Sequence, residues 1–218
     1  MTRHLSTTAA GTEAAGTEAA SIKAASTTVP VHPLLAERWS PRGFDQEHEL
    51  GEQALTALLE AARWAPSAQN SQPWRFLVAR RGEQAHSQLF GALAGGNQAW
   101  AGAASALVLV AARTACDDGS AQPWALYDTG QAVAALVTQA QADGLSVHQM
   151  GGFDTAAVRA GFGLDDTLTP VVILAVGRRD SAADLPGPLA AREAAPRTRQ
   201  PVGDLLLPVS LEPGLAAA

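Results

Sequence analysis

The stretch ARWAPSAQNSQPW at residues 62–74 is a short polar turn between two segments of different pattern. Before it, apolar residues from Leu50 to Ala62 recur at helical spacing. This helix must end by Pro66, because the residue before a proline is driven out of the helical region. After the turn, residues 74–79 are aromatic and branched, which is typical of a strand. A helix, a tight polar turn and a strand thus follow one another closely, as in a mixed α and β fold.

The other patterned segments alternate in the same way. Two apolar runs, residues 106–111 and 171–177, contain no polar side chain, which indicates strands covered on both faces. A long helix is predicted over residues 123–142, with the helix stop Asp143-Gly144 behind it. The weaker predictions are a helix over residues 83–93, a β-like stretch over 145–150 and a brief helix capped by Asp154 and ended by Gly161. No linker interrupts this alternation, so we predict one α+β or α/β domain over residues 30–208.

Residues 1–29 differ in composition from the rest of the chain. They contain the unit AAGTE twice in tandem and almost no large apolar side chains. Such a segment cannot bury enough surface to offset about 1–2 kcal/mol of backbone entropy per ordered residue. We therefore expect a disordered Ala/Thr/Gly-rich tail at residues 1–29 and a weak C-terminal tail at residues 209–218.

Alanine makes up 47 of the 218 residues, so the 47% hydrophobic content overstates the supply of core side chains. Burial of a Val, Leu, Ile or Phe side chain is worth about 1.5–3 kcal/mol, and burial of alanine far less. A domain of this composition is expected to need a partner or a cofactor to complete its core.

Residue counts exclude several chemistries. The single lysine, Lys23, falls in the predicted tail, so P-loop, Schiff-base and lysine general-base chemistry lack their residue. The single cysteine, Cys116, allows no intrachain disulfide, and the five histidines show no metal-ligand spacing, so no metal is expected. A net charge of −6 argues against nucleic-acid binding. No segment has the length of a membrane span or the apolar core of a signal peptide, so we expect a cytoplasmic location and no membrane partner.

Two arginine motifs are the first positive signal. Arg38 and Arg42 bracket Trp39-Ser40-Pro41 near the start of the domain, and Arg197 and Arg199 bracket Thr198 near its end. Arginine with a serine hydroxyl and free helix-end amides is a recurring arrangement for binding phosphate. The alternative is that both motifs are solvated surface arginines.

Two loops offer hydrogen-bonding groups. The polar turn at residues 65–74 carries five amide or hydroxyl side chains, which would suit a flat heterocycle, although helix and strand capping would use the same residues. Gly151-Gly152 follows a β-like stretch and allows close approach of a ligand to the main chain, although a tight turn needs glycine too. Gly161 and Gly163 lack the third glycine of a dinucleotide fingerprint, since Asp166 stands there.

In chain order, these motifs resemble the nitroreductase family of FMN-dependent oxidoreductases. The resemblance covers roughly residues 33–205 and rests on four segments: RWSPRGF from Arg38, ARWAPSAQNSQPW from Ala62, GL at 144–145 with MGGFD from Met150, and RTRQP from Arg197. It implies an α+β fold, namely a three-layer α/β/α sandwich with a mixed, mainly antiparallel sheet, in a domain-entwined homodimer.

The resemblance also implies which residues bind FMN. The two arginine motifs would hold the phosphate and ribityl chain, and the polar turn of the opposite subunit would line the isoalloxazine ring. Gly151 and Gly152 would point main-chain amides toward flavin N5 and O4, and Gln98 would reach the pyrimidine edge. The expected cofactor-binding residues are Arg38, Trp39, Ser40, Arg42, Pro66, Ser67, Ala68, Asn70, Gln98, Met150, Gly151, Gly152, Arg197 and Arg199.

The implied activity is hydride transfer from NADPH or NADH to an electron-poor acceptor such as a nitroaromatic or quinone. No catalytic side chain is expected, because the flavin carries the chemistry. His148 is a titratable group near the glycine loop, and Trp100 and Trp124 are candidate walls of the acceptor pocket; packing roles are the alternative for all three. Two other functions stay open: an FMN-binding storage or sequestration protein with little turnover, and a flavin-dependent dehydrogenase or dehalogenase.

Overall fold

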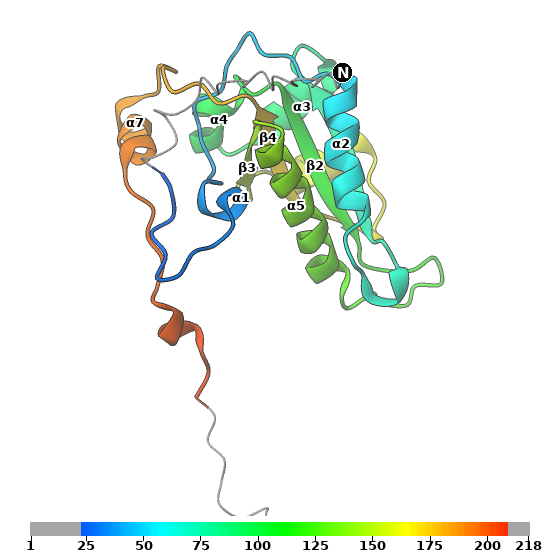
Figure 1. Ribbon diagram of the computed structural model, residues 1–218. Coiled ribbons are helices and arrows are strands. Elements are labelled where there is room, and N and C mark those ends of the chain that lie inside the picture. Colours follow the sequence, from blue (N-terminus) through cyan, green and yellow to red (C-terminus); the bar gives the residue numbers. More distant parts are fainter. Residues whose placement is uncertain (1–22, 209–218) are drawn as a thin grey trace, which may run out of the picture.

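The structure, a computed structural model, describes residues 23–208 (Figure 1). The predicted tails at residues 1–29 and 209–218 lie largely outside the described residues, so their boundaries stay predictions. Residues 23–29 are described, and among them Lys23 is buried and hydrogen-bonded. The elements in chain order are α1 (Pro33–Ala36), α2 (Glu52–Arg63), η1 (Ala68–Asn70), β1 (Trp74–Arg80), α3 (Gln84–Ala92), α4 (Gly95–Ala101), β2 (Ala106–Arg113), α5 (Ala125–Ala142), β3 (Ser146–Met150), α6 (Thr155–Phe162), β4 (Leu168–Gly177), α7 (Gly187–Ala194) and η2 (Val202–Leu205).

A four-stranded sheet with the order β1-β2-β4-β3 forms the centre of the fold. All three neighbouring pairs are antiparallel, which confirms the mainly antiparallel sheet. The two central strands are the apolar runs, and β2 is buried from Ala106 to Ala112. The pairing of β2 with β4 shifts register between Val110 and Ala111, where Pro170 lies opposite Ala111. A proline has no N–H for the ladder, so it is tolerated at such an irregularity.

Alternate side chains of β2 enter two separate cores. Val108 and Val110 pack in a core shared with α2 and α5, whereas Leu107 and Leu109 pack in one shared with α3, α4 and α6. Figure 1 shows α2 and α5 lying together along one side of the sheet. Helices therefore cover both faces, and the predicted three-layer α/β/α sandwich is confirmed.

The predicted helix boundaries at glycine and aspartate are close to those observed. Gly144 follows the end of α5. Its φ is +71°, a conformation that glycine tolerates. Asp154 caps α6, since its Oδ1 accepts a hydrogen bond from the N–H of Ala157 at 2.9 Å. This helix ends at Phe162 and not at Gly161, because Gly163, with a φ of +62°, provides the left-handed residue after its last turn.

Three short helices have no clear sequence pattern. The first, α1, has only four residues, α4 begins with two glycines, and α7 lies in the Pro- and Arg-rich stretch after β4. Short helices are marginal on their own, so tertiary contacts and not local propensity decide whether they form.

Beyond α7 the chain runs away from the sheet as an extended arm that includes η2 (Figure 1). Three successive leucines of this arm, Leu205, Leu206 and Leu207, are 64–89% exposed. Within residues 23–208, no helix combines the length and the apolar character that crossing a membrane requires.

Candidate functional site

The two arginine motifs lie together in space although about 155 residues separate them in the sequence. Partial burial, and then the like charge of Arg199, lower the pKa of the Arg38 guanidinium. Burial and the charges of Arg38 and Arg199 lower the pKa of Arg197 in the same way. None of the ion pairs among residues 23–208 includes any of these three arginines. The result is a group of neighbouring positive charges without a carboxylate partner, which is an arrangement suited to a bound anion.

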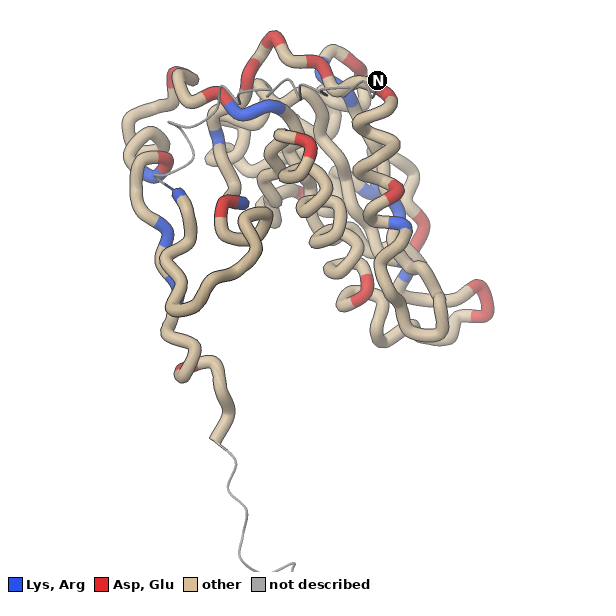
Figure 2. Tube along the Cα trace, in the orientation of Figure 1, with Lys and Arg blue, Asp and Glu red and all other residues tan. Residues whose placement is uncertain are grey.

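Arg197 also holds the surrounding main chain. Its Nη1 donates hydrogen bonds to the carbonyl oxygens of Lys23 and Ala36, each at 2.8 Å. Arg199, by contrast, is exposed, and its guanidinium donates to the carbonyl oxygen of Thr198 at 2.7 Å. Figure 2 shows basic positions following one another along the chain that leaves α7.

Arg42 is in a different electrostatic position from the other motif arginines. Its main-chain N–H donates to both carboxylate oxygens of Glu193, at 3.0 and 3.2 Å, and its guanidinium lies 3.9 Å from the same carboxylate. Glu193 therefore fixes the segment after Ser40 and offsets part of the charge of Arg42. Trp39 and Ser40 are half-buried between the two arginines.

The glycine loop is linked to the first arginine motif. His148, three residues before Gly151 on β3, has its Nδ1 2.9 Å from the carbonyl oxygen of Pro41. Since a carbonyl can only accept, Nδ1 carries the proton. The ring also lies against Trp100, with centroids 4.4 Å apart, and burial lowers the pKa of His148. This histidine therefore holds residues 38–42 beside the loop that follows β3.

Gly151 and Gly152 are both exposed at the end of β3. The carbonyl of Gly152 accepts hydrogen bonds from the N–H of Ala94 at 2.9 Å and from Nδ2 of Asn97 at 3.2 Å. A Cβ at Gly151 would meet no atom within 4 Å, so there is open space on the side where a side chain would project. The loop is thus tied on one side and accessible on the other.

The side chains of two other predicted cofactor-binding residues make contacts inside the protein. The side chain of Met150 is buried in the core with α3, α4 and α6, so its main chain alone could face a ligand. The Nε2 of Gln98 donates to the carbonyls of Phe90 and Gly91, both at 3.2 Å, and so caps the end of α3.

The polar turn lies away from the arginines in one chain. Figure 1 shows η1 beyond the carboxyl end of α2, on the opposite side of the molecule in this view from α1 and α7. Gln69, Asn70 and Gln72 have φ values of 54°, 57° and 46°, a region that residues other than glycine rarely occupy. Strain of this kind gathers at functional sites and needs support from its surroundings. The turn containing Pro66 and Ser67 is therefore a candidate functional element.

The support comes from Asp128, which the sequence predictions missed. This carboxylate is buried on α5, and its Oδ2 accepts a hydrogen bond from the N–H of Ala68 at 2.9 Å. Inside the turn, the Oγ of Ser67 accepts from the N–H of Gln72 at 3.0 Å. A carboxylate on the buried, helically spaced stripe of α5 was a detectable signal. Glu193 and Lys23, which also hold the site, carried no comparable signal.

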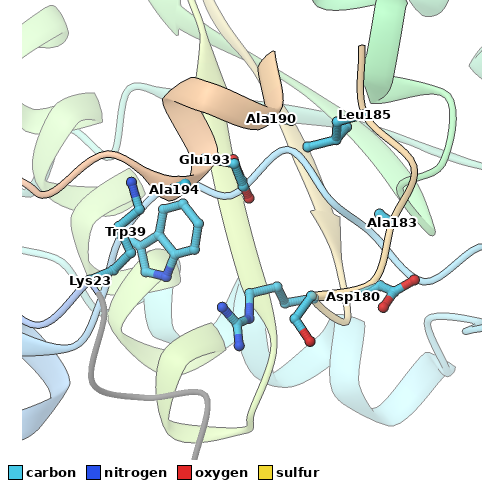
Figure 3. A pocket seen from close by; sticks show the side chains of 10 residues that line it. Lys23, Trp39, Asp180, Ala183, Leu185, Ala190, Glu193 and Ala194 are labelled. Atoms are coloured by element: carbon cyan, nitrogen blue, oxygen red, sulfur yellow. The ribbon is translucent and has the colours of Figure 1, made fainter. Parts of the chain in front are cut away.

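A cavity of about 590 Å³ adjoins the first arginine motif (Figure 3). It opens between α7 and the segment that follows β4, and Trp39 and Glu193 both line it. The described residues contain no group of three or more histidine, cysteine, aspartate or glutamate side chains placed to hold a metal ion.

Comparisons with known proteins agree on one family. The model of the Nitroreductase family matches residues 35–98 and 83–178. A solved structure described as an oxidoreductase containing FMN is 32% identical, covers 88% of this chain and 96% of its own, and has a TM-score of 0.76.

Two relatives from bacteria extend the comparison. An uncharacterized 15.4 kDa protein of Mycolicibacterium smegmatis is 39% identical over 133 residues, which is 57% of this chain and 88% of that protein. A Bacillus subtilis protein with the provisional name NAD(P)H nitroreductase YdgI is 26% identical over 182 residues, 66% of this chain and 86% of its own.

Proposed function

Because this chain belongs to the nitroreductase family, we propose that it is an FMN-dependent oxidoreductase. In this proposal NADPH or NADH is the reductant, and the acceptor is an electron-poor compound such as a nitroaromatic or quinone. The observation that carries it is the group of unpaired guanidinium charges at Arg38, Arg197 and Arg199, which fits the phosphate of FMN. The similar structure described as containing FMN and the nitroreductase name of the Bacillus subtilis relative support it.

The residues of the chain would bind and orient the cofactor. Arg38, Arg197 and Arg199 would bind the phosphate through charge-assisted hydrogen bonds, with Ser40 and Arg42 beside them. The accessible main chain of Gly151 and Gly152 would face the flavin ring, where amide donors stabilise developing negative charge. Bound FMN would supply the redox chemistry, namely hydride transfer between a nicotinamide and an acceptor, and the residues of the chain would bind and orient it.

A second copy of the chain would complete the site. The polar turn at Pro66 to Asn70 lies away from the arginines within one chain, so the two halves of a flavin site do not meet there. Near this turn, Trp64, Trp124 and Tyr127 are 62–75% exposed. Large apolar side chains gathered in one place mark an interaction surface. A homodimer in which each turn lines the partner's flavin accounts for both observations.

An anaerobic reduction experiment tests this function. Purified protein should show flavin absorbance that bleaches when NADPH or NADH is added and returns with a nitroaromatic, quinone or enone acceptor. Protein that binds FMN tightly but stays oxidised would contradict the reductase and favour storage or sequestration. Protein that cannot be reconstituted with FMN would contradict both. Reoxidation by another acceptor class alone would favour a dehydrogenase or dehalogenase.

A further inference from the structure

Lys23, the only lysine of the chain, makes contacts to both arginine motifs. Its ammonium nitrogen lies 4.8 Å from the centre of the Trp39 indole, which belongs to the first motif, and Figure 3 shows the two side chains next to each other. Its carbonyl oxygen accepts the hydrogen bond of Arg197, which belongs to the second motif. One residue therefore touches a member of each motif.

The same side chain is anchored on α7. Its Nζ donates to the carbonyl oxygens of Arg192, at 3.1 Å, and Ala195, at the carboxyl end of that helix. A cation at this position interacts favourably with the helix dipole and with carbonyls that have no partner inside the helix. The chain then continues from Ala195 directly into Arg197 and Arg199.

A second link ties α7 to the first motif. Glu193 accepts hydrogen bonds from the main-chain N–H of Arg42, so α7 is joined to residues 38–42 through Glu193 and through Lys23. The main chain around Lys23 is held as well, because the N–H of Ala25 donates to the carbonyl of Ala36 at 2.8 Å. Lys23 thus belongs to a continuous network that spans both motifs.

The position of Lys23 is electrostatically unfavourable for a positively charged side chain. The residue is 8% exposed, and burial penalises its charged form and lowers the pKa of its ammonium group. Glu193 opposes this shift, while the positive charges of Arg42 and Arg197 add to it. A cation is therefore buried next to other cations. Its hydrogen bonds to α7 and its contact with Trp39 distinguish it from a solvated surface lysine.

We propose that Lys23 is a positioning residue that holds the two arginine motifs together so that they can bind one phosphate group. This inference rests on the proposed function, since the phosphate is that of FMN. Lys23 acts through Trp39, α7 and Arg197, and need not touch the cofactor itself. The ligand group concerned is the phosphate and not the flavin ring.

A binding experiment with two flavins separates positioning from general stability. The full-length chain, freed of flavin, is titrated with FMN and with riboflavin, which lacks the phosphate, and quenching of flavin fluorescence is recorded. For Lys23→Met, which keeps the aliphatic stem, we expect the dissociation constant of FMN to rise about tenfold and that of riboflavin to stay unchanged. Arg192→Met is the matched control, because it removes one positive charge from α7 without removing the carbonyl that Lys23 contacts.

Three outcomes would overturn the inference. The first is an unchanged FMN affinity in Lys23→Met, the second is equal weakening of FMN and riboflavin, and the third is an Arg192→Met variant that weakens FMN as much. A wild-type protein that binds FMN no more tightly than riboflavin would instead contradict the phosphate site of the proposed function. Hydrogen exchange gives an independent readout without flavin, since the amide of Ala25 should exchange faster in Lys23→Met.

Discussion

Arg38, Arg197 and Arg199 are held in place by different means, although their charges act together. Arg197 donates to two carbonyl oxygens, whereas Arg38 is half-buried and repelled by Arg199. Guanidinium groups stay protonated even under mutual repulsion, so an anion bound between them would relieve the repulsion directly. The energetic role of these residues therefore depends on what they bind.

Replacing Arg38 with alanine should weaken FMN binding about 10- to 100-fold, because the lost contact to a phosphate is charge-assisted. Riboflavin binding should not change. Equilibrium titration of both flavins measures the effect, and Arg80→Ala is a suitable control, since Arg80 lies on β1 and forms an ion pair with the exposed Glu52. Equal FMN affinity in wild type and Arg38→Ala would contradict the phosphate assignment.

Three histidines make the stability of the fold depend on pH. Burial is the main cause that lowers the pKa of His48, His86 and His148 from the ordinary value of 6.5. A depressed histidine pKa means that the unfolded chain binds more protons, so stability is complete above about pH 6.5 and is lost as the pH falls below it. Each histidine contributes a slope of at most about 1.4 kcal/mol per pH unit.

Chemical denaturation between pH 7 and pH 5 tests this dependence. His86 is the informative position, because its ring stacks on Phe90 and its Nε2 is buried without a hydrogen-bond partner among the described residues. In His86→Leu the free energy of unfolding should fall less steeply with decreasing pH than in wild type. Parallel curves of unfolding free energy against pH for the two proteins would show that His86 has the same pKa in the folded and the unfolded chain.

Among the elements, η1 and α5 are joined by a hydrogen bond that a buried carboxylate accepts. Three residues of the turn have positive φ, and the buried carboxylate of Asp128 on α5 holds the turn through the N–H of Ala68. The strained residues therefore lie in the turn, whereas the carboxylate that holds the turn lies on α5. Removing the anchor should release the turn without unfolding the sheet.

Asp128→Ala should lower the free energy of unfolding by about 1–3 kcal/mol, as expected when a partly buried donor loses a charged acceptor. Hydrogen exchange should accelerate in peptides covering residues 66–72 and stay slow in β2. Asp128→Asn keeps an acceptor oxygen and should restore most of the protection. Unchanged exchange in the alanine variant would show that the turn holds its conformation without α5.

Sequence patterns predicted the elements that bury a regular apolar face and missed those that depend on distant contacts. The buried strands β2 and β4 and the long helix α5 have strong periodic or apolar signals. By contrast, α4 begins with glycines, and α7 is fixed by the contacts of Glu193 and Lys23. No local pattern reports a contact between residues so far apart in the chain.

The same limit applied to the site. Residue types predicted the arginine motifs and the polar turn, because phosphate binding and tight turns each favour particular side chains. Two acidic residues hold them. Asp128 lies on the buried stripe of a long helix, and Glu193 lies on a short helix. Only the first of these has a position in the sequence that marks it as unusual.

At the scale of the whole molecule, the proposed flavin site needs two chains. One chain holds the arginines near α7 and the polar turn at the far end of α2 (Figure 1). Flavin binding and dimerisation should therefore be coupled, since a ligand that binds only the dimer stabilises it.

Trp124→Glu should shift the protein toward the monomer and release FMN, because a charge would replace a 62% exposed aromatic side chain in the proposed interface. Sedimentation measured together with flavin absorbance detects both changes. Val31→Glu serves as a control, since Val31 is also exposed but lies before α1. A monomeric Trp124→Glu protein that keeps its flavin would contradict a site shared between subunits.

The chain has one side-chain amine, and the residue that carries it is only 8% exposed. Reagents that acylate amines should therefore modify Lys23 slowly in the native protein and quickly once the segment around it opens. The labelling rate at this single position, measured by mass spectrometry, then reports how fast that segment opens. Immobilisation or crosslinking through side-chain amines, in turn, should capture opened molecules in preference to native ones.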